Sequence, residues 1–223
     1  MVVGIHEEIA NMIQPNQTIL FQGDSITDVG RNRGVTGPNE TAGFGQGYPL
    51  LLGSYLLGRF PTYSLKIYNR GISGNRVPDL HERWQADCLD LKPDILSILI
   101  GVNDIWHKLN GNYDGTVKDY EEGYHNLLDR TRRELPDVKL VICEPFVLRT
   151  GAVDDRWFPE FDERRAVAKK QAEVFAATFV PLQEVYDLAV QDAKPTYWTG
   201  DGVHPTMAGH AKLAMAWGEA VIE

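Results

Sequence analysis

The sequence lacks the residues and motifs on which several classes of protein depend. Its 223 residues include only two cysteines and no CxxC spacing, so we expect neither a disulfide framework nor a cysteine zinc site. It has no HExxH motif and no cluster of histidines, and no metal site is predicted. Acidic residues outnumber basic ones by 31 to 22, which argues against a nucleic-acid partner. No apolar run approaches about 18 residues, so no membrane-spanning helix is predicted.

The amino-terminal residues lack the basic start and the unbroken apolar stretch of a secretion signal. Instead, Ile5, Ile9 and Ile13 recur on one helical face, which predicts that residues 1–14 form a helix docked on the rest of the chain. The two cysteines, Cys88 and Cys143, are predicted to be buried free thiols. These features favour a cytoplasmic protein, unless a signal has been removed from the chain.

Short apolar runs alternate with helical patterns along the chain. The run from residue 94 to residue 100 is apolar almost throughout, as in a strand buried on both faces of a parallel sheet. Successive strands lie about 30 to 45 residues apart, which is typical of repeated βαβ units. We therefore predict an α/β fold in one domain, residues 1–223, with helices on both faces of a five-stranded parallel sheet. The expected strands are 18–21, 65–69, 94–100, 138–143 and 179–182, and the helices flanking the last one are 162–179 and a second that ends near residue 193.

The segment Gly23-Asp24-Ser25 joins the first expected strand to the start of a helix. A tight turn here places the Ser25 hydroxyl at the carboxyl edge of the sheet, where open α/β folds bind their ligands. Ser25 is therefore the candidate nucleophile. In a structural alternative, Ser25 caps the helix and Asp28 is the acidic residue of its first turn.

A histidine and an aspartate near the carboxyl terminus supply the other groups that a serine nucleophile needs. Pro205 holds His204 ahead of the last helix, because the residue before a proline avoids helical geometry. Asp201 lies three residues earlier and can reach the Nδ1–H of His204. That bond leaves Nε2 free to accept the Ser25 proton. The structural alternative is a helix-entry turn with a solvated histidine.

Ester hydrolysis also needs donors for the oxyanion of the tetrahedral intermediate. The candidates are the backbone N–H groups of Ser25 and Gly74 and the carboxamide of Asn103. The turns that carry Gly74 and Asn103 follow the second and third strands, so they should meet the first turn at one sheet edge. Taken singly, Gly74 is also explained as a turn glycine and Asn103 as a residue that closes a turn. Their occurrence together with His204, in this order, favours an esterase.

Four segments together resemble the sequence blocks of the SGNH hydrolases, also called the GDSL family. The resemblance implies that Ser25 is nucleophile and oxyanion donor, that Gly74 and Asn103 are further donors, and that Asp201 and His204 complete a catalytic triad. It also implies a flavodoxin-like three-layer α/β/α sandwich and no metal or organic cofactor. The GxSxG motif of the α/β-hydrolases is absent. The four segments are Gly23-Asp24-Ser25, Gly74, Gly101-Val102-Asn103-Asp104 and Asp201-Gly202-Val203-His204.

Longer stretches resemble one branch of this family, the bacterial carbohydrate acetylesterases, which include intracellular acetylxylan esterases. The matching stretches are 23–28, 69–75, 101–106 and 201–205. The resemblance implies removal of small acyl groups, above all acetyl, from a small-molecule or oligosaccharide ester. Some members of the branch form homo-oligomers, so a homo-oligomer is an expectation here.

Residues beside these turns are candidates for contact with the substrate. Phe44, Trp106 and Trp198 suit a sugar ring, an acyl chain or an aryl ester, and Arg76 suits an acidic sugar; core packing or a solvated charge is the alternative. Two other functions stay open. One is a short-chain lipolytic esterase, thioesterase or lysophospholipase, although the sequence shows no exposed apolar lid. The other is a carbohydrate-binding protein without catalytic activity.

Overall fold

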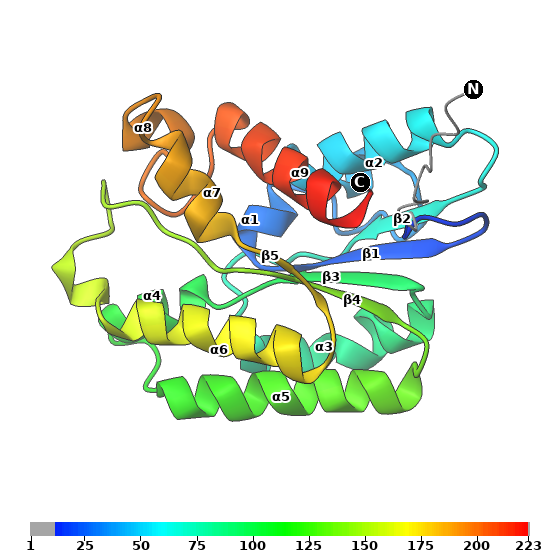
Figure 1. Ribbon diagram of the computed structural model, residues 1–223. Coiled ribbons are helices and arrows are strands. Elements are labelled where there is room, and N and C mark those ends of the chain that lie inside the picture. The colour runs from blue at the N-terminus through cyan, green and yellow to red at the C-terminus, as the bar shows by residue number, and fades with distance from the viewer. Residues whose placement is uncertain (1–11, 223) are drawn as a thin grey trace, which may run out of the picture.

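The computed structural model describes residues 12–222 and is built around one five-stranded sheet (Figure 1). All neighbouring strands pair in parallel, in the order β2-β1-β3-β4-β5. This confirms the predicted five-stranded parallel sheet with helices on both sides, and the strand order is that of flavodoxin-like folds. The strands are β1 Thr18–Gly23, β2 Lys66–Asn69, β3 Ile95–Leu99, β4 Lys139–Cys143 and β5 Thr178–Val180.

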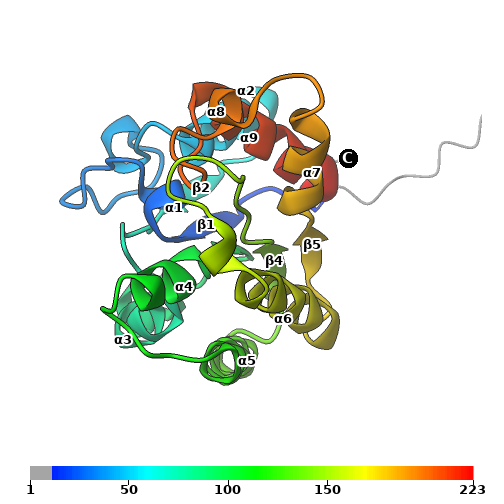
Figure 2. The same cartoon turned by 90° about the vertical axis from the view of Figure 1, so that its left-hand side faces the viewer.

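Two layers of helices enclose the sheet, as Figures 1 and 2 show from perpendicular directions. In the first layer are α2, α7, α8 and α9, and a core cluster that includes Phe21 and Trp217 lies beneath them. In the second are α3, α5 and α6, over a cluster that includes Trp84 and Tyr124. The helices are α1 Ser25–Asp28, α2 Tyr48–Arg59, α3 Val77–Asp87, α4 Val102–Leu109, α5 Val117–Glu134, α6 Glu160–Val174, α7 Leu182–Ala189, α8 Pro195–Trp198 and α9 Met207–Val221.

The burial pattern of each segment explains its secondary structure. Every residue of β3 is buried, and β1 buries all but its first residue, as expected of central strands in a parallel sheet. In contrast, α5 buries apolar side chains along one face only. Its start is fixed by a capping box: the Thr116 hydroxyl accepts from the Asp119 N–H, and the Asp119 carboxylate accepts from the Thr116 N–H.

Several predicted boundaries are wrong in the last third of the chain. The helix predicted over 162–179 is α6, which ends at Val174, because Ala176 adopts a left-handed conformation (φ 49°) and turns the chain into β5. The next helix, α7, ends at Ala189 rather than near residue 193. Two helices, α4 and α8, were not predicted, because with eight and four residues they are too short to show a clear apolar period.

The predicted amino-terminal helix, residues 1–14, lies mostly outside the described residues. Of its expected apolar face, Ile13 is fully buried in the core. Cys88 and Cys143 are buried free thiols, as predicted. None of the helices within residues 12–222 has the length and hydropathy needed to span a membrane.

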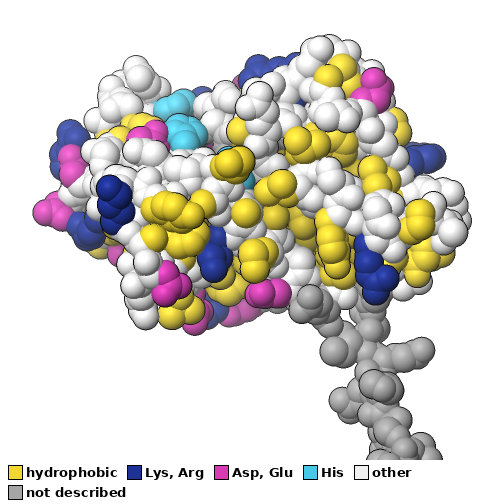
Figure 3. All heavy atoms as spheres, turned by 90° about the horizontal axis from the view of Figure 1, so that it is seen from above, with side chains coloured by type: hydrophobic (Ala, Val, Ile, Leu, Met, Phe, Trp, Pro, Cys, Tyr) yellow, Lys and Arg dark blue, Asp and Glu magenta, His cyan; other side chains and the backbone are white. Residues whose placement is uncertain are grey.

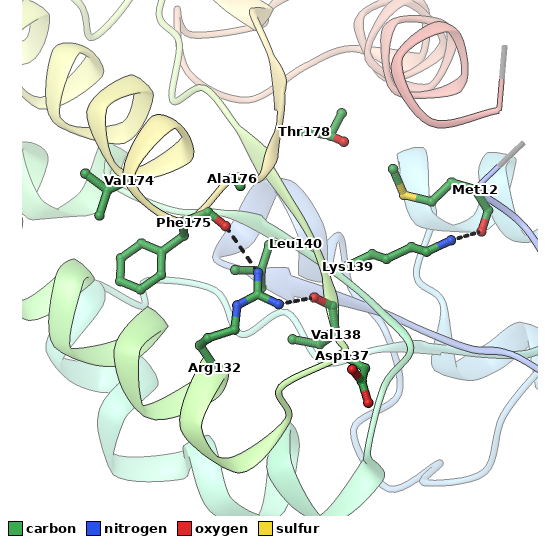
Figure 4. Close-up of a pocket in the computed structure, with 10 residues that line it drawn as sticks. All are labelled: Met12, Arg132, Asp137, Val138, Lys139, Leu140, Val174, Phe175, Ala176 and Thr178. Carbon is green, nitrogen blue, oxygen red and sulfur yellow. Dashed lines mark hydrogen bonds between the residues drawn. The ribbon is translucent and has the colours of Figure 1, made fainter. Parts of the chain in front are cut away.

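A hollow of about 570 Å³ opens at the amino-terminal edge of the sheet, where β4 and β5 begin (Figure 4). Its two cations already have partners. Arg132 donates to the carbonyls of Val138 and Phe175. Lys139 donates to the carbonyl of Met12. The predicted site residues follow the opposite, carboxyl ends of the strands, so this hollow is not part of their site.

Candidate active site

The turn after β1 presents Ser25 at the carboxyl edge of the sheet. A glycine is required at position 23, two residues before Ser25, since a Cβ on Gly23 would lie 2.4 Å from the carbonyl oxygen of Leu99. Asp24 caps α1, because its Oδ1 accepts from the Ile26 N–H at 3.0 Å. The alternative in which Ser25 is the cap is therefore wrong. Ser25 is the first residue of α1, and its hydroxyl is available for another partner.

Ser25, His204 and Asp201 form a continuous chain of hydrogen bonds. Ser25 Oγ lies 2.8 Å from His204 Nε2, and His204 Nδ1 lies 2.7 Å from Asp201 Oδ2. The other oxygen, Asp201 Oδ1, accepts from the backbone N–H groups of Val203 and His204 at 2.9 and 2.8 Å. These bonds hold the carboxylate against the imidazole. As predicted, His204 lies just ahead of the last helix, α9.

The charge of Asp201 decides which nitrogen of His204 carries the proton. Burial raises the pKa of Asp201, but hydrogen bonds from the imidazole and from two backbone N–H groups outweigh it and hold the pKa below its usual range. The ionised carboxylate therefore accepts the Nδ1–H, which leaves Nε2 to accept from Ser25. The His204 and Asp201 side chains are 43% and 38% exposed, so this pair lies at an open surface.

Gly74 and Asn103 come together at the same edge of the sheet. Gly74 has a φ of 84°, which favours glycine, and a Cβ on it would meet only His107 Cε1, at 3.9 Å. The space in front of Gly74 is therefore open. Asn103 is the second residue of α4 and donates from Nδ2 to the Asn75 carbonyl at 3.2 Å. A carboxamide nitrogen has a second hydrogen, which Asn103 can offer to a ligand.

Two buried carboxyl groups adjoin these residues. Asp24 is 1% exposed and Asp104 is 0% exposed, and burial raises the pKa of each to about 7. Asp104 Oδ1 accepts from the Val77 N–H at 3.3 Å, and the charge of Arg164 lowers its pKa less than burial raises it. Neither carboxyl was predicted as functional, although each stands next to a predicted site residue in the sequence.

Two rings of α4 line the site. The Trp106 ring lies 5.7 Å from the His204 ring and 5.6 Å from the Trp157 ring, measured between centroids. His107 borders the open space described above, and burial, with the nearby charge of Arg76, lowers the pKa of its imidazole. His107 is not among the site residues predicted from the sequence. A sequence signal for it exists, because His107 follows Asn103 by four residues. On a helix such as α4, this spacing places both side chains on one face.

The other predicted substrate contacts have different surroundings. Phe44 is 4% exposed and lies in the core, so the prediction that it contacts substrate is wrong. Trp198 donates its indole N–H to the Ala193 carbonyl at 3.1 Å. Arg76 donates to both carboxylate oxygens of Asp79, at 2.9 and 3.0 Å. Contact of Trp198 and Arg76 with a substrate stays a prediction.

The assembled groups are those of nucleophilic acyl transfer. They comprise a hydroxyl, a base that can take its proton, a carboxylate that orients the base, and nearby N–H donors. Within residues 12–222, no group of three or more histidine, cysteine or acidic side chains is placed to hold a metal ion.

Comparison with known proteins identifies close relatives. A model of the GDSL-like Lipase/Acylhydrolase family matches residues 21–212. Acetylxylan esterase from Geobacillus stearothermophilus is 34% identical over 211 residues, 92% of this chain and 94% of that protein. A crystal structure of a GDSL-like lipase from Parabacteroides merdae has a TM-score of 0.91 and 49% identity, and the match covers 94% of this chain and 97% of that one.

Crystal structures of an acetylxylan esterase from Geobacillus stearothermophilus also match. One has a TM-score of 0.84 and 31% identity, and the match covers 94% of this chain and 96% of that one. Three are catalytic mutants of that enzyme, in which alanine replaces a serine, an aspartate or a histidine. There the serine and histidine are 179 residues apart, and the aspartate precedes the histidine by three. Ser25, Asp201 and His204 have the same separations in this chain.

Proposed function

Because the chain belongs to the GDSL-like lipase/acylhydrolase family and is a carboxylic ester hydrolase, we propose that it is a serine esterase that removes small acyl groups, above all acetyl, from carbohydrate. The hydrogen-bonded chain from Ser25 through His204 to Asp201 carries the proposal. The equal separations of the residues changed in the catalytic mutants support these roles. A non-catalytic carbohydrate-binding protein is no longer retained, because the family is one of acylhydrolases.

In the proposed acylation step, Ser25 Oγ attacks the ester carbonyl carbon while its proton moves to His204 Nε2. The imidazolium that forms is stabilised by the Asp201 carboxylate, which already lies 2.7 Å from Nδ1. When the tetrahedral intermediate collapses, the bond to the alcohol breaks and the alcohol leaves with the proton from Nε2. The acyl group remains on Ser25 as an ester.

The proposed oxyanion donors are the backbone N–H groups of Ser25 and Gly74 and the carboxamide of Asn103. Each such donor typically lowers the barrier by about 2.7–4 kcal/mol. In deacylation, a water molecule gives a proton to His204 Nε2 and attacks the acyl carbon. When this second tetrahedral intermediate collapses, the bond between the acyl carbon and Ser25 Oγ breaks and Ser25 takes the proton from His204 Nε2. The product leaves as a carboxylic acid, which loses its remaining proton to water. Only side chains, backbone N–H groups and water take part in these steps.

The surroundings of the site support a small acyl group on a larger alcohol. The His204 side chain is 43% exposed, so a bulky sugar can approach the reacting hydroxyl from solvent. The half-buried Trp106 ring beside His204 is suited to packing on a sugar ring. The 34% identity to acetylxylan esterase over 92% of the chain supports the same substrate class.

A short-chain lipolytic esterase, thioesterase or lysophospholipase is the second candidate. The 49% identity to a GDSL-like lipase supports it. Hydrolysis of acetyl, butyryl and octanoyl p-nitrophenyl esters and of acetylated xylo-oligosaccharides, with Ser25→Ala as the blank, tests the choice. A preference for acetyl with release of acetate from the sugars supports the carbohydrate acetylesterase. Rates that hold or rise with chain length, without acetate from the sugars, support the lipolytic enzyme.

The predicted homo-oligomer is also a proposal, and we place its interface on α9. The outer face of this helix carries Met207 and Met215, which are 87% and 59% exposed, and a hollow of about 410 Å³ opens at the surface between α9 and α2, which pack against each other. Apolar side chains are visible on this side of the molecule in Figure 3. In an antiparallel pair of α9 helices centred near Met215, Lys212 of one copy would face Glu219 of the other.

Light scattering of the wild type tests this interface. We expect a dimer or a larger assembly, loss of it on Lys212→Glu, and its return in Lys212→Glu combined with Glu219→Lys. A monomer at every concentration contradicts the proposal. The predicted cytoplasmic location rests on the buried free thiols and is tested by cell fractionation.

A further inference from the structure

The loop after β2, which carries Gly74, is fixed to α1 by side chains that the proposed reaction does not use. Asn69 Nδ2 donates to the Thr27 carbonyl at 2.6 Å, and Asn69 Oδ1 accepts from the Gly71 N–H at 2.8 Å. The two segments also touch, since a Cβ on Gly71 would lie 2.5 Å from the backbone nitrogen of Asp28. The position of the loop therefore depends on α1.

Asp28, the last residue of α1, contacts Ser73, the residue that directly precedes Gly74. Its Oδ2 accepts from the Ser73 backbone N–H at 2.9 Å and from the Ser73 hydroxyl at 2.8 Å. Arg33 donates to the same oxygen at 2.5 Å. The Asp28 side chain is 3% exposed and that of Arg33 is 51% exposed, so the carboxylate lies inside the protein and the guanidinium at its surface.

This contact restrains Ser73 at two points. Burial raises the pKa of Asp28, but hydrogen bonds from Arg33 and Ser73 outweigh it and hold the pKa below its usual range. Hydrogen bonds to an ionised acceptor are shorter and stronger than those between neutral groups. With its backbone N–H and its hydroxyl bound to one carboxylate oxygen, Ser73 can turn little. The next peptide group, which carries the Gly74 N–H, is held with it.

We propose that Asp28 is a positioning residue for the oxyanion donor Gly74 and acts through Ser73. The inference rests on the proposed function, in which the Gly74 N–H stabilises the tetrahedral intermediate. Because Ser25 begins α1 and Asp28 ends it, one short helix carries the nucleophile and sets the donor opposite it. A misplacement of about 1 Å in such a site lowers the rate by about 100-fold.

Hydrolysis of p-nitrophenyl acetate by a set of variants tests the proposal. Asp28→Ala removes all three hydrogen bonds, and we expect kcat to fall about 10- to 100-fold with KM changed by less than about twofold. Asp28→Asn keeps the shape and one acceptor oxygen but loses the charge, and we expect a loss of about three- to tenfold. The matched control is Arg33→Lys, which keeps a cation beside Asp28 and leaves both Ser73 bonds; its kcat should stay within about twofold of the wild type.

Inhibition by phenylboronic acid distinguishes positioning of Gly74 from a purely structural role, because loss of stability alone would not change the inhibition constant. The boronate forms a tetrahedral adduct with the serine and places an oxygen among the oxyanion donors. We expect the inhibition constant of Asp28→Ala to rise in proportion to its loss of kcat/KM. A lowered Tm with an unchanged inhibition constant overturns the proposal.

Three other results also overturn it. The first is a kcat of Asp28→Ala within about twofold of the wild type, and the second is an equal loss in Arg33→Lys. The third applies if Asp28→Ala does not fold. In that case the proposal is overturned if Asp28→Asn has the kcat and the boronate inhibition constant of the wild type. If the wild type hydrolyses no ester above the Ser25→Ala blank, the proposed function itself fails, and this inference fails with it. Wild-type activity with an unaffected Asp28→Ala refutes the positioning role alone.

Discussion

Replacing Asp201 by asparagine tests the hydrogen-bond chain through the protonation state of His204. Asp201 Oδ1 accepts from the backbone N–H groups of Val203 and His204, so an asparagine must place its carbonyl oxygen there. Its NH₂ group then points at His204 Nδ1 and donates to it. Nδ1 becomes the acceptor, and the proton of the neutral imidazole moves to Nε2. Ser25 Oγ, 2.8 Å away, then faces a donor where it needs an acceptor.

The expected loss follows from this wrong tautomer. In Ser-His-Asp triads generally, this change lowers kcat by about 10⁴-fold, which corresponds to about 5 kcal/mol. Here the Asp201 side chain is 38% exposed, and water competes with the protein for the imidazole. We therefore expect a loss of about 10³- to 10⁴-fold in kcat with KM little changed. Activity above the uncatalysed rate should remain, because the oxyanion donors are intact.

Release of p-nitrophenol from p-nitrophenyl acetate measures this loss, with Ser25→Ala as the blank. Asp192→Asn, at an exposed position, is the matched control and should behave as the wild type. The melting temperature of Asp201→Asn should stay close to that of the wild type, since the side chain keeps its shape and its backbone hydrogen bonds. A kcat within about threefold of the wild type would refute the assignment of Asp201 as the orienting acid.

Three further predictions concern the oxyanion donors and a buried carboxyl. In steady-state kinetics, Asn103→Ala should lower kcat by about 10²- to 10³-fold and leave KM unchanged. A change in KM with kcat at the wild-type value would contradict its role as an oxyanion donor. Gly74→Ala should lower the free energy of unfolding measured in urea by about 1–2 kcal/mol, because alanine is strained at a φ of 84°. The variant should still fold, since the added Cβ meets only His107 Cε1, at 3.9 Å. Burial raises the pKa of Asp104 to about 7, so the native state binds its proton more tightly than the unfolded state, and its contribution to stability falls as pH rises from about 4 to about 7. As pH rises through that range, Asp104→Asn should therefore gain stability relative to the wild type, by a few kcal/mol at most. A difference in unfolding free energy that does not change with pH would contradict the raised pKa of Asp104.

Much of the fold was predictable because its signals are local. A strand that is buried on both faces, such as β3, is apolar almost throughout, and a parallel sheet puts the carboxyl ends of its strands at one edge. These two facts, with the order of the motifs along the chain, were enough to predict that the turns carrying Ser25, Gly74 and Asn103 meet at one edge of the sheet. The parallel pairing of β2, β1 and β3 agrees with this.

The failures at the site have a common physical cause, which is that residue type alone does not specify the turn or the packing on which each of them depends. Ser25 and Asp24 are equally good helix caps by residue type, and only the three-dimensional turn makes Asp24 the cap. Phe44 stands in the loop that follows the Ser25 turn in the sequence, yet it packs in the core. The contact of Asp28 with Ser73 joins residues 45 positions apart, and no local pattern announces it.

The chain order of the hydrogen-bonded groups has a consequence for synthesis. Ser25 is translated 179 residues before His204, and α9, which follows the histidine, packs against α2 near the start of the chain. The proposed base, His204, therefore reaches Ser25 only after the segment that carries it has left the ribosome. A nascent chain that ends before His204 carries Ser25 without its proposed base, so hydrolytic activity should require synthesis beyond this residue. Ribosome-bound chains that end before residue 201 should not react with an activated ester.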